Sequence, residues 1–433
     1  MSVNQDLLQR RYKVMGKSAP LFYDKPLHLV RGEGVWLYDQ QGKRYLDVYN
    51  NVPHVGHCNP RVVEALSKQA ATLNIHTRYL NENIVNYIER LSATFDDSLS
   101  MAMLTCTGSE ANELALRMAR HCTGGSGIIV TDFAYHGNTE AVAEIGTGFM
   151  PEAKHSKRVK AFPIPDSYRG LDGISAEQLT DAYADAVQQA IDEFEADGVK
   201  LAGMLVCPDF ANEGLLNVPQ GFLEKATAKV RKAGGVLIAD EVQAGFGRSG
   251  RHFWAHQWYD LVPEIVTMGK PMGNGHPLAG VIARADMIEE FSEAAMYFNT
   301  FGGNPVSCAV GMAVLDCLEQ DSLMENAIST GGYVTRGLKS LQQQYPLIGD
   351  VRDLGMFFAV ELVTDPDTKA PAALEARMVM NLMRDRAVLI SRIGVHDNIL
   401  KLRPPMPFQP EHADLLLSTL DEVLTLVSKG MAS

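Results

Sequence analysis

The chain has 433 residues, of which 46% are hydrophobic and 21% charged, a composition typical of a globular protein with two or three domains. Its formal net charge of -13 argues against an extended nucleic-acid footprint, although a small anion can still bind a locally positive site. No apolar run approaches the ~20 residues of a membrane span, and the N-terminus lacks the apolar region of a secretory signal. None of the six cysteines forms a C-x-x-C pair. We therefore expect no nucleic-acid or membrane partner, no disulfide framework and a cytoplasmic location.

The residue pattern of the first part of the chain indicates an N-terminal arm followed by a short β-rich stretch. Residues 1–30 mix charges with prolines and predict an N-terminal arm, and residues 34–47 predict two strands around a Gln-Gly turn. His54 and His57 lie close together, but no second group of ligands supports a metal site, so we expect none. Pro60 then begins an amphipathic helix.

Apolar segments alternate with helical segments from residue 101 to residue 270. The predicted strands are 101–106, 128–131, 201–207, 235–239 and 265–268. Helical patterns lie between them, for example at 182–194 and 222–232. This alternation predicts an α/β fold with a mainly parallel sheet that helices cover on both faces. The C-terminal part mixes helices with strands and predicts a separate α+β lobe.

A single lysine follows the last of these strands. Residues 265–268 form a short apolar run, Lys270 comes two residues later, and a loop rich in glycine and proline follows. Ligands of open α/β sheets bind beyond the carboxyl ends of the strands. A lysine that is partly desolvated there has a lowered pKa and a free amine that can form a Schiff base. Taken alone, however, such a lysine is more often a surface residue.

Three other strand ends carry polar or aromatic groups. Thr107-Gly108-Ser109 leads into a helix N-terminus, which suits a phosphate, although, taken alone, an ordinary helix cap explains it better. Tyr135 can stack on a planar ring or pack in the core. Asp240 ends a buried apolar strand and needs a cation, which is either a pyridinium N–H or a partner such as Arg248. Together with Lys270, these groups match what a protein supplies to pyridoxal phosphate.

The same stretches resemble the class III (ω-type) members of the fold type I pyridoxal-phosphate enzymes. The matching motifs are T-G-S-E-A-N at 107–112, Y-H-G at 135–137, A-D-E-V-Q-A-G-F-G-R at 239–248, M-G-K-P-M-G-N-G-H-P-L at 268–278 and T-F-G-G-N-P at 300–305. The resemblance extends nearly end to end. It implies a mainly parallel seven-stranded sheet in a large cofactor-binding domain at 61–315. A smaller α+β domain is implied at 316–433, with an arm and part of the small domain at 1–60.

The resemblance also implies how pyridoxal 5'-phosphate is held. Gly108 and Ser109 would bind its phosphate, Asp240 its pyridine nitrogen, and Lys270 would form the Schiff base. The other implied cofactor contacts are Tyr135 stacked on the ring, His136, Val242 beneath the ring and Gln243 at the ring hydroxyl. Thr300 would contact the phosphate in the neighbouring subunit, which implies a homodimer and leaves open whether dimers pair into tetramers.

Within this class, further stretches resemble the ethanolamine-phosphate phospholyases, with the 5-phosphohydroxy-L-lysine phospholyases close behind. They include Y-N-N-V-P-H-V-G-H-C-N-P at 49–60, N-I-H-T-R-Y-L-N-E-N-I-V at 74–85 and I-L-K-L-R-P-P-M at 399–406. Aminotransferases of this class that act on α-amino acids commonly carry an arginine three residues before the Pro-Pro, where Lys401 stands here. The glutamate that pairs with that arginine falls at Asn212, or at Glu213 if one residue is gapped. Alternatively, Arg403 does the arginine's work after a small shift.

These features predict a lyase that eliminates phosphate from O-phosphoethanolamine, with Lys270 as the base. The candidate ligands of the substrate phosphate are Lys401, Arg403, Arg78, Asn50, Asn51 and Tyr23. A class III ω-aminotransferase and a phospholyase acting on 5-phosphohydroxy-L-lysine remain alternatives, as does a protein that kept the fold without catalysis. The presence of Lys270, Asp240 and Gln243 argues against the last of these.

Overall fold

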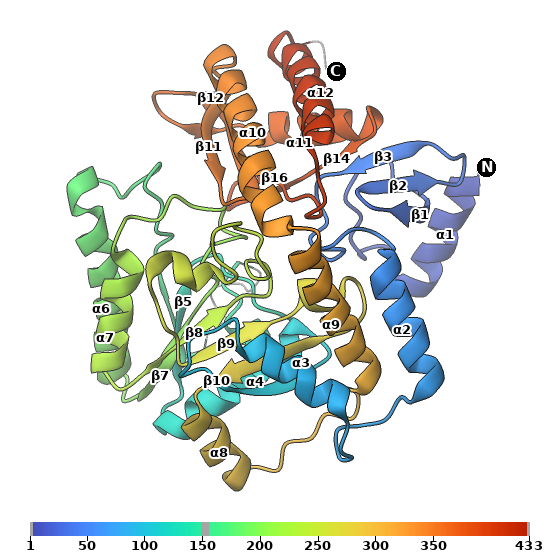
Figure 1. Cartoon of the computed structure of the whole chain (residues 1–433). Coiled ribbons are helices and arrows are strands. Elements are labelled where there is room, and N and C mark those ends of the chain that lie inside the picture. The colour runs from blue at the N-terminus through green and yellow to red at the C-terminus, as the bar shows by residue number, and fades with distance from the viewer. Residues whose placement is uncertain (1–2, 149–155, 431–433) are drawn as a thin grey trace.

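The computed structural model describes residues 3–148 and 156–430, and a seven-stranded sheet lies at its centre (Figure 1). Its strands, in spatial order, are β4 (Met101–Thr105), β10 (Ala279–Ala283), β9 (Ile265–Met268), β8 (Val236–Asp240), β7 (Leu201–Val206), β5 (Gly127–Thr131) and β6 (Val159–Phe162). β10 is antiparallel to both of its neighbours, and all other pairs are parallel. The mainly parallel seven-stranded sheet is thereby confirmed.

Helices cover both faces of this sheet, as the apolar strands require. Alternate residues of β5 face opposite sides: Ile128 and Val130 belong to one buried cluster, and Ile129 belongs to another. The first cluster includes side chains of α4 (Gly108–Thr123) and α8 (Ala285–Ala294). The second includes side chains of α6 (Leu179–Ala196) and α7 (Phe222–Lys232). The sheet is therefore the core of a three-layered domain, and its strand ends are held rigidly.

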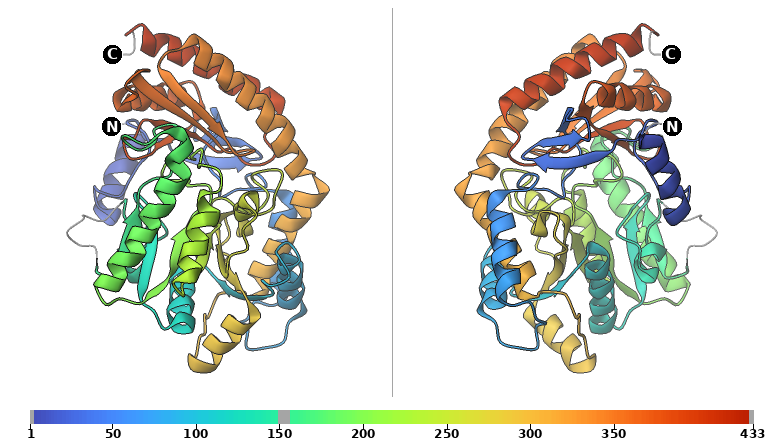
Figure 2. Two further views of the ribbon diagram at one scale, coloured as in Figure 1. Left: turned by 90° about the vertical axis from the view of Figure 1, so that its left-hand side faces the viewer. Right: turned by 90° about the vertical axis from the view of Figure 1, so that its right-hand side faces the viewer.

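A smaller lobe lies above this domain in Figure 1 and carries an antiparallel sheet. Its strands, in spatial order, are β11 (Ile348–Asp353), β12 (Phe358–Asp365), β16 (Ile399–Leu402) and β15 (Ser391–Ile393), and β13 (Ala370–Pro371) pairs with β12. Its helices are α10 (Leu323–Gln344), α11 (Ala373–Asp385) and α12 (Pro410–Ser428). The side views of Figure 2 show α9 (Pro305–Gln320) and α10 running from the large domain into the small one. The predicted domain boundary between residues 315 and 316 falls inside α9.

The N-terminal stretch joins the small lobe. After α1 (Val3–Met15), the strands β1 (Leu29–Glu33), β2 (Trp36–Asp39) and β3 (Arg44–Asp47) form a meander. β3 then pairs in parallel with β14 (Val388–Leu389), a strand of the C-terminal part. The chain next enters the large domain through α2 (Pro60–Thr72) and α3 (Glu82–Ser92), both packed on α9. The segment between β3 and α2 therefore crosses from one lobe to the other.

Two predicted elements match the structure residue for residue. The helix expected at 222–232 and the strand expected at 265–268 are found at those residues. β6 and β10 were not predicted: Lys160 interrupts the apolar pattern of β6, and β10 contains a glycine and follows the glycine- and proline-rich loop after Lys270. No helix among residues 3–148 and 156–430 combines the length and apolarity that crossing a membrane would require.

Candidate active site

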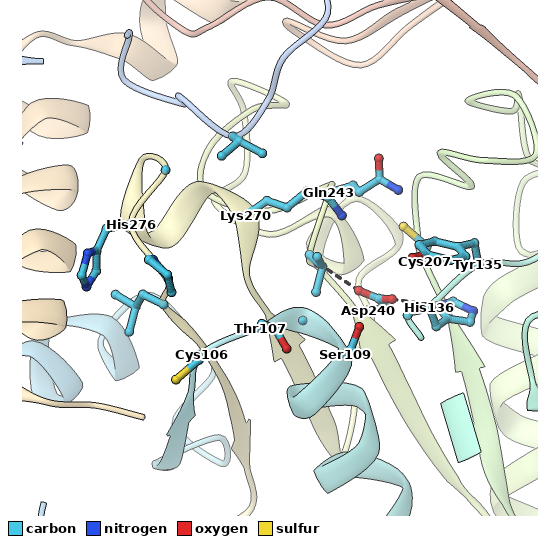
Figure 3. A pocket seen from close by; sticks show the side chains of 17 residues that line it. Cys106, Thr107, Ser109, Tyr135, His136, Cys207, Asp240, Gln243, Lys270 and His276 are labelled. Carbon is cyan, nitrogen blue, oxygen red and sulfur yellow. Dashed lines mark hydrogen bonds and ion pairs between the residues drawn. The ribbon is translucent and has the colours of Figure 1, made fainter. Parts of the chain in front are cut away.

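A cavity of about 310 Å³ opens at the carboxyl ends of the parallel strands, beside the N-terminus of α4 (Figure 3). Such ends are where open α/β sheets bind ligands, because loops diverge there and helix N-termini point inward. The predicted residues that line the cavity are Gly108, Ser109, Tyr135, His136, Asp240, Val242, Gln243 and Lys270. The structure therefore brings together every cofactor residue predicted from this chain's own strand ends.

Lys270 extends into this cavity from the short 3₁₀ turn that follows β9 (Figure 3). Burial lowers the pKa of its amine, and the nearby charge of Arg403 lowers it further. Asp240 acts in the opposite direction but does not outweigh them. A lysine whose pKa is lowered in this way holds more of its amine in the neutral form, which is the nucleophilic and basic form.

Asp240, the last residue of β8, is held by three donors. His136 Nδ1 donates to its Oδ2 at 2.7 Å, Asn112 Nδ2 donates to the same oxygen at 3.0 Å, and the backbone N–H of Val242 donates to Oδ1 at 3.0 Å. Burial alone would raise the pKa of Asp240, but the hydrogen bond and charge of His136 outweigh it, so the pKa lies below its usual value. Asp240 is therefore a carboxylate fixed to meet a cation in the cavity.

The turn into α4 is shaped to receive an anion. Thr107 caps the helix. Its side chain accepts a hydrogen bond from the N–H of Glu110, and the carboxylate of Glu110 accepts one from the N–H of Thr107. Gly108 is required at the first helical position, because a Cβ there would lie 2.9 Å from both methyl groups of Val242. The first N–H groups of a helix have no acceptor within it, and the helix dipole favours negative charge at this end. A phosphate fits at this turn.

Gln243 lies between the cavity and two buried cations of the small lobe. Lys401 Nζ donates to Gln243 Oε1 at 3.3 Å, and Arg403 Nη1 donates to the same oxygen. On the other side, Gln243 Nε2 lies 3.5 Å from Asn212 Oδ1. Lys401 itself lies on β16, and Arg403 follows one residue after that strand ends.

The two cations are buried without a carboxylate partner. Lys401 and Arg403 expose only 4% and 3% of their surface, yet neither has an ion pair within 4 Å among the described residues. The ring of Phe357 lies 5.4 Å from Lys401 Nζ and 5.3 Å from Arg403 Cζ, and Tyr49 lies 5.6 Å from Arg403 Cζ. Such contacts offset only part of the cost of desolvation. Burial strongly lowers the pKa of Lys401, and the charge of Arg403 lowers it further.

None of the six predicted phosphate ligands lines the cavity: Lys401 and Arg403 lie behind Gln243, and the other four lie elsewhere. Arg78 is exposed, with its guanidinium 3.7 Å above the Phe298 ring. Asn50 donates to Asp47 at 3.0 Å, and the hydroxyl of Tyr23 donates to Ile390 O at 3.0 Å. Asn51 differs from them, because it is buried next to the lining residue Val52 and its Nδ2 has no hydrogen-bond partner among the described residues.

Thr300 is exposed and lies outside the cavity of its own chain.

Arg248, the alternative partner of Asp240, instead donates to His54 and to the backbone oxygens of Met356 and Pro404. This leaves Asp240 to face the cavity.

Two residues that shape the site were missed. Asn112, on the buried face of α4, bridges Asp240 to Thr267, whose hydroxyl donates to Asn112 Oδ1 at 2.6 Å. A buried asparagine on an apolar helix face was the available signal. Cys207 lines the cavity immediately after β7, and its thiol donates to Asp209 Oδ1 at 2.9 Å. Its position at a strand end could have singled it out.

A buried amine, a fixed carboxylate and a helix N-terminus at neighbouring strand ends define the site of a fold type I pyridoxal-phosphate enzyme. Lys270 has the amine that the cofactor aldehyde requires, Asp240 meets a protonated ring nitrogen, and Gly108 leaves room for the phosphate. The chain belongs to the class III aminotransferase family: the profile described as "Aminotransferase class-III" matches residues 22–424. Pyridoxal 5'-phosphate is the cofactor of this family.

Three relatives illustrate the similarity. A solved structure described as a phospholyase from Arthrobacter in complex with phosphoethanolamine is 48% identical, with a TM-score of 0.94 over 97% of this chain and 99% of that one. "Ethanolamine-phosphate phospho-lyase homolog 1" of Caenorhabditis elegans is 34% identical over 98% of this chain and 94% of that protein. "Alanine--glyoxylate aminotransferase 2-like" of Drosophila melanogaster is 38% identical over 98% of this chain and 87% of that protein.

Proposed function

We propose that this enzyme is a pyridoxal-phosphate-dependent phospholyase that acts on O-phosphoethanolamine. The reaction breaks a C–H bond at the amine-bearing carbon and the C–O bond of the phosphate ester, and inorganic phosphate leaves with the electron pair. The enamine that remains takes up water and yields acetaldehyde and ammonia. The net change consumes one water and needs no oxidant, reductant or second substrate.

The observation that carries this proposal is the pair of buried cations behind Gln243. A buried charge without a partner costs several kcal/mol, and the charge of Asp209 offsets only part of this cost for Lys401 and Arg403, so an anionic ligand would compensate the pair. A phosphate dianion would do so, because it offers several oxygens to the donors of Lys401 and Arg403. A substrate carboxylate would be matched by a single bidentate arginine, and the position of that arginine holds Lys401.

The similar proteins support the same substrate class. The Arthrobacter phospholyase, which is 48% identical, was solved with phosphoethanolamine, and the worm relative is named for the same reaction.

Proton transfer falls to residues of the large domain. When bound, pyridoxal phosphate supplies an aldehyde that joins covalently to amines and a ring that accepts the electrons left by the departing proton. Lys270 lies in the cavity with a lowered pKa, so its amine can remove the proton from the amine-bearing carbon. Asp240 would keep the ring nitrogen protonated, and His136 and Asn112 hold that carboxylate in place.

Departure of phosphate falls to residues of the small lobe and the crossing segment. Lys401 and Arg403 would stabilise the charge that develops on the leaving oxygen. Asn51 would add a donor, because its buried Nδ2 has no partner among the described residues. Arg78, Asn50 and Tyr23 stay further candidates for this role. The proton on carbon would then pass to Lys270, and the phosphate would leave toward the cations behind Gln243.

A homodimer is part of the proposal. Thr300 would bind the cofactor phosphate of the neighbouring subunit, and its exposure at the surface supports this arrangement. Phe301 beside it is 70% exposed, an unusual exposure for a phenylalanine unless another chain covers it. Pairing of dimers into tetramers and a cytoplasmic location stay predictions.

A class III aminotransferase is the second candidate, and the name of the Drosophila relative favours it. One assay separates the two: release of inorganic phosphate from phosphoethanolamine, with and without pyruvate as amino acceptor. We expect phosphate release that does not depend on pyruvate. Alanine formation that requires pyruvate, with no phosphate released, would refute the lyase. A parallel assay with 5-phosphohydroxy-L-lysine tests the longer substrate.

A further inference from the structure

The side-chain amide of Gln243 has only one orientation available to it. Lysine and arginine side chains donate hydrogen bonds and accept none. Since Lys401 and Arg403 both contact the same end of the amide, that end must be the oxygen. The NH₂ group therefore lies at the other end, 3.5 Å from Asn212 Oδ1. Because Gln243 also lines the cavity with Lys270 and Asp240, it presents donors there rather than an acceptor.

The same two cations still have donors to spare. In its ammonium form, which a bound phosphate dianion favours, Lys401 has three N–H groups and uses two, on Gln243 and on Ala211 O at 3.3 Å. Arg403 has five and uses two, on Gln243 and on Tyr49 O at 3.4 Å. One donor of Lys401 and three of Arg403 therefore have no acceptor among the described residues. An anion that takes these donors polarises the cations that orient Gln243 and competes with its oxygen.

We propose that Lys401 and Arg403 are positioning residues for Gln243, and that Gln243 couples phosphate binding at these cations to the hydrogen bond offered to the cofactor ring oxygen. The inference rests on the proposed function, because it assumes that the substrate phosphate binds Lys401 and Arg403. It adds a physical link between the leaving group and the ring. With a substrate that lacks phosphate, the hydrogen bonds from Lys401 and Arg403 to Gln243 Oε1 stay intact. A phosphorylated substrate weakens them.

This link explains why a glutamine suits position 243. A glutamate would form ion pairs with both cations and would present no donor to the cavity. A leucine would leave the cations in place, but it has no polar group to connect phosphate binding with the cofactor ring. The three side chains differ little in size, so substitutions at this position separate the coupling from the packing.

The experiment uses the cofactor-loaded protein at rest, with inorganic phosphate as the probe. Phosphate affinity is measured by calorimetry, and the absorption band of the bound cofactor is recorded during the same titration. In the wild type we expect saturable binding and a shift of the band that follows the same curve. In Gln243→Leu we expect phosphate to bind within about threefold of the wild-type affinity, with at least three quarters of the shift lost. In Lys401→Met we expect binding weakened at least tenfold.

Two variants serve as matched controls. Gln189→Leu and Lys232→Met alter exposed residues of α6 and α7, and both should titrate like the wild type. Thermal unfolding of each cofactor-free variant shows whether the fold is intact, and Gln243→Glu provides a second test. Its band should not respond to phosphate, because its carboxylate holds both cations.

The outcomes are distinguishable from failure of the lyase itself. A full shift in Gln243→Leu overturns the coupling. Absence of phosphate binding by the wild type also overturns it, and if phosphoethanolamine still releases phosphate, the lyase function stands and its phosphate site lies elsewhere. A wild-type shift that persists in Lys401→Met shows that phosphate acts through another site and overturns the assignment of the cations.

Discussion

Two groups of polar residues on either side of Gln243 differ in how their charges are compensated. We call the polar residues that line the cavity the first wall, and we call Lys401 and Arg403, which lie behind Gln243 and outside the lining, the second wall. On the wall that belongs to the large domain, Asp240 is met by three donors, and Thr107 and Glu110 cap α4 reciprocally. On the wall that belongs to the small lobe, Lys401 and Arg403 are buried side by side with a neutral amide as their shared acceptor. On the first wall, Asp240 is held by three donors without a substrate, although His136 Nε2 has no partner among the described residues. On the second, neither cation has a carboxylate within 4 Å among the described residues, and the charge of Asp209 offsets only part of the cost of burying them.

This difference shows which wall does which work. A polar network whose members are all satisfied stabilises the fold and fixes geometry, which suits a cofactor that stays in place. Uncompensated buried charges cost stability and are kept where a transient ligand neutralises them. Substitutions on the first wall should therefore lower the rate of the reaction. Substitutions on the second should lower kcat/KM for the substrate and leave the free energy of unfolding unchanged or higher.

The largest effect is expected on the first wall, at Lys270. Lys270→Ala should lower turnover of phosphoethanolamine by about 10⁴-fold or more, at the upper end of what a general base contributes. The protein should still bind cofactor through Gly108, Ser109 and Asp240. Phosphate release measures the first effect and absorbance after gel filtration the second. Wild-type phosphate release by this variant would contradict the assigned base.

Asp240→Asn should be next, with a loss of about 10²-fold or more, because an amide cannot keep the ring nitrogen protonated. His136 would then lose its carboxylate acceptor as well. Glu241 is a suitable comparison, since it instead accepts from the N–H groups of Ala255 and His256 and from the His256 ring. Glu241→Gln should lower the free energy of unfolding and leave turnover of phosphoethanolamine largely unchanged. If the two variants behave in the opposite way, Glu241 is the acid that faces the ring.

The first wall was predictable from the sequence, and the reason is local. Asp240 ends a short apolar run, and Lys270 and the turn at 107–109 each begin two residues after one, so the topology of the sheet alone brings them to one edge. The helix cap is also a pattern within four residues. The cofactor could be inferred because all of its contacts of this kind are encoded at strand ends.

The second wall was not predictable in its essential feature. The sequence pointed to Lys401 and Arg403 as cations, but not to their contact with Gln243, which lies 158 and 160 residues away in the chain. That contact depends on how the small lobe packs against the large domain, which no periodic pattern encodes. For the same reason Asn112 was missed, because its partner Asp240 is 128 residues distant.

Lys401→Met sharpens the comparison, because activity and stability should move in opposite directions. We expect use of phosphoethanolamine to fall by about one to two orders of magnitude, since a charge-assisted hydrogen bond contributes roughly 1.5–3 kcal/mol. The free energy of unfolding should be unchanged or higher by on the order of 1 kcal/mol, because an uncompensated buried charge is removed. The two measurements are kcat/KM by phosphate release and urea unfolding of the cofactor-free protein. A large loss of stability would mean that Lys401 is structural.

The smallest effect on activity is expected at Glu213, a carboxyl buried near Lys401 whose titration should change stability instead. Burial raises its pKa to about 8 from its usual 4.5, Asp209 nearby acts in the same direction, and the charge of Lys401 only partly opposes them. Between those two pH values the folded protein binds a proton that the unfolded chain releases. Stability contributed by this group is therefore present at low pH and is lost as the pH rises toward 8.

Glu213→Gln removes this dependence while keeping the size of the side chain. The variant should match the wild type near pH 4 and exceed its free energy of unfolding at pH 9 by on the order of 5 kcal/mol. Urea unfolding of the cofactor-free protein at several pH values measures the difference, and Glu224→Gln, an exposed position of α7, is the matched control. Parallel pH curves for Glu213→Gln and the wild type would show that Glu213 is ionised when folded. The second wall would then hold a counter-charge for Lys401, and the contrast between the two walls would be smaller than we describe.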